Sequence, residues 1–120
     1  MKIALTTTGD TLDSDLDPRF GRASRFLIYD SELKNWVTID NSQNLNAAQG
    51  AGIQAATTLC KTGATVLITG HCGPKAFKVL TAAGVTIYPC KAKTVAEALA
   101  QFNNNELCET NEATNEGHWI

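Results

Sequence analysis

The chain has 120 residues, of which 43% are apolar and 18% charged, a balance typical of one soluble globular domain with a single core. It contains no apolar run of 18 residues and no N-terminal segment typical of a signal peptide, so we expect no membrane partner and a cytoplasmic protein with reduced cysteines. The net charge of −2 argues against a dedicated nucleic-acid-binding protein.

Charge is unevenly distributed along the chain. Residues 1–102 hold ten basic and eight acidic residues, a net charge of +2, whereas residues 103–120 hold four glutamates and no lysine or arginine. We expect residues 1–102 to form an α/β domain and residues 103–120 to form an acidic, largely disordered C-terminal tail. A mildly basic domain permits an anionic ligand.

The first half of the chain predicts strands only. Apolar runs that favour β-structure predict strands at 2–8, 25–30 and 35–39, and the short gap between the last two predicts an antiparallel hairpin. Residues 9–24 form a polar stretch of 16 residues, which is long for a connection in a compact domain. Ordered loops of this length are often functional.

The second half predicts alternating helices and strands. The predicted helices are 49–62, 74–83 and 94–102, and the predicted strands are 65–69 and 85–88. Glycines end the first two helices, and Thr94 with Glu97 predicts a capping box at the start of the third. The order β-β-β-α-β-α-β-α, with helical connections between parallel strands, predicts an α/β fold with a five-stranded mixed sheet flanked by helices.

The strongest candidate site lies between a buried strand and a helix, and its residues are Gly70, His71, Cys72, Gly73, Pro74 and Lys75. Ligands of open α/β sheets bind beyond the C-terminal ends of the strands, and the N–H groups of a helix N-terminus favour an anion. The glycines allow close approach of a ligand, and Lys75 adds positive charge. Cys72 is expected to have thiolate character and to be the most reactive thiol of the domain. The alternative is a glycine-rich turn with incidental His and Cys.

A second candidate site lies in residues 17–25, which contain all the arginines of the chain: Arg19, Arg22 and Arg25. Guanidinium groups suit oxyanions and other diffuse anions. Phe20 offers an apolar wall, and Gly21 allows close approach. The alternative is that these arginines only neutralise Asp13, Asp15 and Asp17.

Other chemistries have weak support. The aspartates at 13, 15 and 17 begin like a calcium loop, but Pro18 stands where that loop needs glycine. The four cysteines form no C-x-x-C pair, which argues against a closed zinc site. The glycines at 50 and 52 lack the rest of a nucleotide-binding fingerprint. We therefore expect no catalytic residues and no set of protein ligands to a metal.

Taken together, segments 17–23, 26–30, 50–52 and 70–77 resemble the dinitrogenase iron-molybdenum cofactor biosynthesis family. The likeness spans about residues 1–102 and implies a ribonuclease-H-like fold. It also implies a carrier or scaffold for a preformed anionic metal–sulfur cluster rather than an enzyme. The family often has His where this chain has Arg19, which removes a possible metal ligand and adds a fixed charge. Relatives often have an aliphatic residue where this chain has Cys72, so the thiol is either a ligand or a tolerated small residue.

The residues and the resemblance together predict one cluster site, where loops 17–25 and 70–75 meet and the asparagine-rich loop 41–48 adds a third wall. The expected contacts are Arg19, Phe20, Gly21, Arg22, Asn44, Gly70, His71, Cys72, Gly73, Pro74 and Lys75. We expect a molybdenum-containing cluster, with Mo-Cu-S favoured over Fe-Mo-S. A cluster whose metals are already coordinated by sulfide needs charge and apolar contacts, not a bond from protein to metal.

Two other functions stay open at this point. One is a cofactor-free regulatory or protein-interaction module, for which the acidic tail is a candidate motif for an unknown protein partner. The other is a ribonuclease-H-like nuclease, which the absence of acidic residues from the predicted strand 2–8 and helix 49–62 argues against. Visible colour and metal content distinguish a cluster carrier from both.

Overall fold

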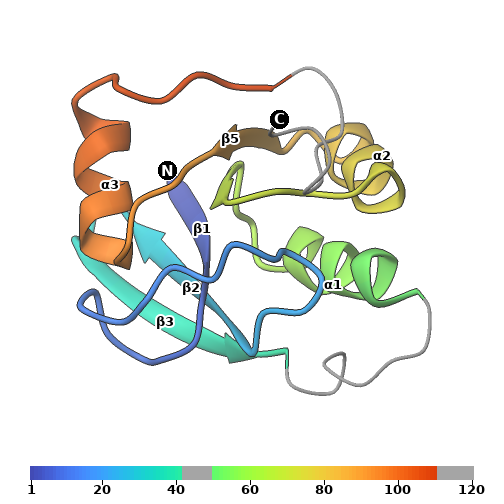
Figure 1. The fold of residues 1–120 in the computed structure, drawn as a ribbon, viewed down its shortest axis with the longest axis horizontal. Helices are drawn as coiled ribbons and strands as arrows, with labels where there is room; N and C mark the ends of the chain where they lie inside the picture. The colour runs from blue at the N-terminus through green and yellow to red at the C-terminus, as the bar shows by residue number, and fades with distance from the viewer. Residues whose placement is uncertain (42–49, 111–120) are drawn as a thin grey trace.

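A five-stranded mixed sheet in the order β3-β2-β1-β4-β5 forms the centre of the computed structural model, which describes residues 1–41 and 50–110 (Figure 1). The strands are β1 Lys2–Thr7, β2 Arg25–Asp30, β3 Asn35–Asp40, β4 Val66–Thr69 and β5 Thr86–Pro89. Strands β1, β2 and β3 pair antiparallel, whereas β1, β4 and β5 are parallel. The C-terminal ends of three parallel strands therefore meet at one edge of the sheet.

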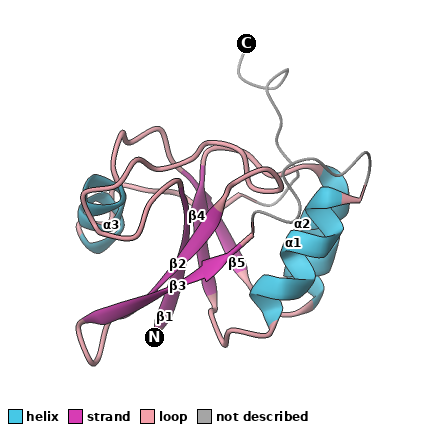
Figure 2. Ribbon diagram, turned by 90° about the horizontal axis from the view of Figure 1, so that it is seen from below, coloured by secondary structure: helices cyan, strands magenta, loops and turns pink. Residues whose placement is uncertain are grey.

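In the described residues, three helices cover the two faces of the sheet: α1 Ala51–Cys60, α2 Pro74–Ala82 and α3 Val95–Asn103. Helices α1 and α2 lie on one face and α3 on the other (Figure 2). A hydrophobic core lies on each face of the sheet, and alternate residues of β1 point into one or the other. Ala4 packs on the α1–α2 side, whereas Ile3 and Leu5 pack on the α3 side. No helix within the described ranges is long and apolar enough to cross a membrane.

The predicted order of elements is confirmed, and the predicted helix and strand ends lie within two residues of the observed ones. Gly63 and Gly84, which were expected to end α1 and α2, have φ values of 84° and 85°. Glycine adopts this left-handed conformation without the steric cost that a Cβ atom brings. The glycines therefore fix where each helix gives way to the next parallel strand.

The predicted capping box of α3 is half confirmed. The Thr94 hydroxyl accepts a hydrogen bond from the Glu97 N–H at 3.2 Å, as expected. The Glu97 carboxylate accepts from the Lys93 N–H at 3.1 Å, however, and not from that of Thr94. The Glu97 side chain thereby fastens Lys93, the residue before the N-cap, to the helix.

The long segment 9–24 crosses the edge of the sheet and is anchored in both cores. Leu16 is buried in the core beneath α3, and Phe20 is buried in the core beneath α1 and α2. The Asp17 N–H donates to the Thr6 carbonyl at 2.8 Å, and the Thr7 hydroxyl donates to the Asp15 carbonyl at 2.8 Å. The segment is therefore a fixed cover over the C-terminal end of β1.

The first residues after α3 contact the domain. Leu107 packs against the α3-side core, and the Thr110 N–H donates to the Ile87 carbonyl of β5 at 2.9 Å. The expected disorder therefore does not extend to these two residues. Residues 111–120, the rest of the expected tail, lie outside the described ranges.

Gly70→Ala is expected to lower the free energy of unfolding by about 1–3 kcal/mol, the usual cost of overpacking. A Cβ atom at Gly70 would lie 2.6 Å from both Cα and Cβ of Pro18, which the surrounding hydrogen bonds hold in place. Gly73→Ala is the matched control, because a Cβ atom there meets nothing within 4 Å. Urea unfolding measures both variants, and equal midpoints would contradict the close packing of Gly70 on Pro18.

Candidate functional site

The two segments expected to form one site do meet at the C-terminal edge of the sheet. The His71 N–H donates to the Pro18 carbonyl at 2.8 Å, and the Phe20 N–H donates to the His71 carbonyl at 3.3 Å. Arg19 and His71 thus form a short parallel bridge. Gly70 lies directly against Pro18, where no side chain fits. The small size of Gly70 therefore serves the contact between the two loops rather than the approach of a ligand.

A buried polar cluster lies beneath this junction. The Thr6 hydroxyl donates to the Asp17 carbonyl and lies 2.8 Å from the Thr69 hydroxyl. Because Thr6 has one hydroxyl proton, Thr69 is the donor in the second bond. This cluster links the ends of β1 and β4 to the segment above them, so their buried hydroxyls are satisfied.

Arg19 pairs with Asp17, as the alternative interpretation of segment 17–25 expected, whereas Arg25 pairs with Asp10, which that interpretation did not include. The carboxylate of buried Asp17 accepts from the Arg19 N–H at 2.9 Å and from the Arg19 Nε at 3.4 Å. Arg25 Nε lies 3.3 Å from an oxygen of Asp10. Arg22 is half-buried. The Asp17 carboxylate therefore offsets part of the positive charge of Arg19.

The expected role of Phe20 as an open apolar wall is wrong. Its side chain is only 2% exposed and stacks on Phe26 with ring centroids 5.5 Å apart. Gly21 beside it packs on α1, since a Cβ atom there would lie 3.1 Å from the backbone of Gly52. Both residues therefore pack against the rest of the domain and hold the loop in place.

The expected thiolate character of Cys72 is also wrong. Cys72 is 1% exposed, and burial raises the pKa of its thiol to about 12. The loss of hydration outweighs the stabilisation that a helix N-terminus offers to a thiolate. Cys90, at the end of β5, is likewise buried, and burial raises its thiol pKa. Both thiols are protonated at neutral pH.

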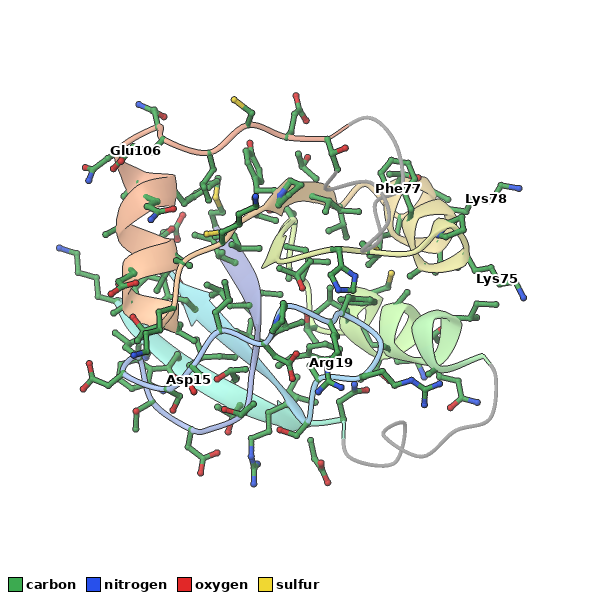
Figure 3. The ribbon with its side chains drawn as sticks, in the orientation of Figure 1. Asp15, Arg19, Lys75, Phe77, Lys78 and Glu106 are labelled. Atoms are coloured by element: carbon green, nitrogen blue, oxygen red, sulfur yellow. The ribbon has the colours of Figure 1, made fainter. Side chains whose placement is uncertain are left out.

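The N-terminus of α2 faces the junction through its backbone. Gly73 precedes the helix without a side-chain cap, and Pro74 occupies the first turn. The first N–H groups of a helix have no acceptor within it, so they are available to an anion. The side chain of Lys75, in contrast, projects outward with Lys78 and away from Arg19 (Figure 3). We therefore assign the anion-binding potential of this turn to its N–H groups.

A cleft of about 530 Å³ opens beside the junction. Its lining residues are Asp15, Leu16, Pro18, Gly70, His71, Cys90, Lys91, Ala92 and Lys93. The segment that follows β5 forms one wall of this cleft, and sequence reasoning missed it. The available signal was the pair of lysines, Lys91 and Lys93, directly after a predicted parallel strand.

The expected third wall lies mostly outside the described ranges, and so does Asn44. Its first residue, Asn41, is buried and donates through Nδ2 to the Ala23 carbonyl at 2.7 Å. In residues 1–41 and 50–110 there is no group of three His, Cys, Asp or Glu side chains able to hold a metal ion.

Alkylation by iodoacetamide at pH 8 is expected to modify Cys108 first and Cys60 next, with Cys72 and Cys90 modified only after unfolding. Cys108 is exposed and Cys60 is partly exposed, whereas the other two thiols are buried and protonated. Peptide mass spectrometry over a time course gives the order, and labelling in denaturant is the control in which all four react. Modification of Cys72 before Cys60 would contradict the buried position of Cys72.

Three comparisons relate this chain to known proteins. It is similar to the apo form of the orange protein from Desulfovibrio gigas, with a TM-score of 0.91 and 38% identity over 95% of this chain and 96% of that one. It is similar to a Thermotoga protein of the DUF35 family, with a TM-score of 0.84 and 35% identity over 96% and 97% of the two chains. An uncharacterized protein of Methanocaldococcus jannaschii is 30% identical over 110 residues, 89% of each chain.

The family model described as dinitrogenase iron-molybdenum cofactor matches residues 1–105. This range contains the whole sheet, all three helices, the loop junction and the cleft. The chain belongs to the dinitrogenase iron-molybdenum cofactor family.

Proposed function

We propose that this protein is a non-catalytic carrier of an anionic molybdenum–sulfur cluster in the cytoplasm. The observation that carries the proposal is the hydrogen-bonded meeting of segments 18–20 and 70–71 beside the open N-terminus of α2, in a family named for a molybdenum cofactor. Of the two cluster types that the family resemblance implies, we propose a mixed molybdenum–copper sulfide cluster rather than an iron–molybdenum one. The four free cysteines suit a reducing compartment.

The contacts follow from the chemistry of such a cargo. A cluster whose metals are already bound by sulfide presents a large, soft anionic surface, which needs N–H donors and diffuse positive charge. Gly73 and the first turn of α2 after Pro74, which itself has no N–H, supply N–H donors. Arg22 and Arg19 supply guanidinium charge, part of which Asp17 offsets at Arg19.

The protein needs no bond to metal in this proposal. Cys72 lies directly below the junction, but its thiol is buried and protonated. The role of Cys72, like that of Phe20, is to support the loops from the core. His71 lines the cleft and contributes through its backbone, which its hydrogen bonds to Pro18 and Phe20 hold in place.

Arg22→Gln is expected to weaken uptake of the cluster about ten- to hundredfold, because a hydrogen bond to a charged group is worth ~1.5–3 kcal/mol and each ~1.4 kcal/mol is tenfold in affinity. Arg25→Gln is the matched control, since it removes the same charge from the arginine that pairs with Asp10. Cys72→Ser should keep most of the binding. Anaerobic reconstitution with tetrathiomolybdate and copper, followed by visible absorption and metal analysis, compares the variants.

Two results would contradict the proposal. Loss of the chromophore in Cys72→Ser with retention in Arg22→Gln would replace charge recognition by thiolate ligation. A wild-type protein that takes up neither molybdenum nor copper would favour the cofactor-free interaction module.

A further inference from the structure

Three chain segments line the cleft beside the loop junction. Two of them are the joined segments described above, and the third is not part of that junction. Pro18 and His71 come from the joined segments, whereas residues 90–93 follow β5 and lead into α3. These three segments follow or cover the ends of the parallel strands, where open α/β sheets bind ligands. A volume of about 530 Å³ is sufficient for a ligand of several heavy atoms.

The third wall is fixed in place at both ends. The Cys90 N–H donates to the Thr69 carbonyl at 2.8 Å, and the Lys93 carbonyl accepts from the Leu16 N–H at 2.9 Å. The Glu97 side chain holds the Lys93 N–H at 3.1 Å. A loop anchored in this way loses little conformational freedom when a ligand binds, so its shape is already prepared.

The charge in the cleft favours an anion. Lys91 and Lys93 are exposed and line it, and Asp15 is the one acidic residue among the lining residues. Much of the remaining lining is apolar, from Leu16, Pro18 and Ala92. Two ammonium groups on an otherwise weakly polar surface suit a large anion with diffuse charge, whereas a small, strongly hydrated anion would lose more hydration there than it regains.

We propose that this cleft binds the thiomolybdate part of the cargo, and that Lys91 and Lys93 are the lysines that recognise it. The inference rests on the proposed function. It places the contact with thiomolybdate in the loop of residues 90–93, which lies outside the two segments that form the junction. The exposed lysines of α2 do not take this role, because Lys75 and Lys78 project away from the junction (Figure 3).

The test uses tetrathiomolybdate alone as the probe and equilibrium dialysis with molybdenum analysis as the readout. The double variant Lys91→Gln/Lys93→Gln is expected to bind about tenfold more weakly than wild type, or about 1.4 kcal/mol. The double variant Lys75→Gln/Lys78→Gln removes the same charge from an exposed helix and is expected to stay within about twofold of wild type. Thermal unfolding of each variant confirms that it is folded.

A second measurement does not depend on the variants. Titration of the isotopically labelled wild-type protein with tetrathiomolybdate should shift the amide resonances of residues 90–93 more than those of residues 31–34, the β2–β3 turn at the opposite end of the sheet. Unchanged affinity in Lys91→Gln/Lys93→Gln, or shifts confined to other residues, would overturn the inference while leaving the proposed function intact. Absence of any molybdenum binding to wild type, with or without copper, would overturn both.

Discussion

The attachment of segment 15–20 across the ends of β1 and β4 is the constraint on which the rest of the site depends. Thr6 and Thr69 lie in adjacent parallel strands, and their hydroxyls meet directly beneath Asp17. A side chain at Gly70 would clash with Pro18, so the segment could not then pass this close to the end of β4. Because Leu16 and Phe20 anchor it in opposite cores, the position of the candidate site is set by the packing of the whole domain (Figure 2).

The charged groups at this edge of the sheet fall into two sets. Asp17 and Asp10 pair with Arg19 and Arg25, so these ion pairs chiefly hold the loop in shape. Lys91, Lys93 and the first turn of α2 lie around the junction without being needed for its backbone pairing. Under the proposed function, the charges that hold the loop and the charges that contact the cluster are thus largely separate.

The sequence predicted the fold well because its signals are local. Apolar spacing, the glycines after α1 and α2, and the Thr94 cap each act within a few residues, and the topology rules for parallel strands then bring loops 17–25 and 70–75 to one edge. Burial is not local. Phe20 and Cys72 stand in polar, glycine-rich segments that indicate exposure, yet helices α1 and α2 cover them. Lys91 and Lys93 were missed because the cleft forms only when segment 15–18 is placed opposite them.

The buried thiols have a consequence for how a cargo leaves. Thiolates exchange readily with sulfide on soft metals, and a carrier with reactive cysteines beside its cargo would compete for those metals and dismantle the cluster. Cys72 and Cys90 lie on opposite sides of the sheet near the site, and both are covered and protonated. In the proposed carrier, a cluster held by charge and N–H donors above such a surface would depart intact, without breaking a metal–protein bond, so that its delivery would be a dissociation step and not a ligand-exchange reaction.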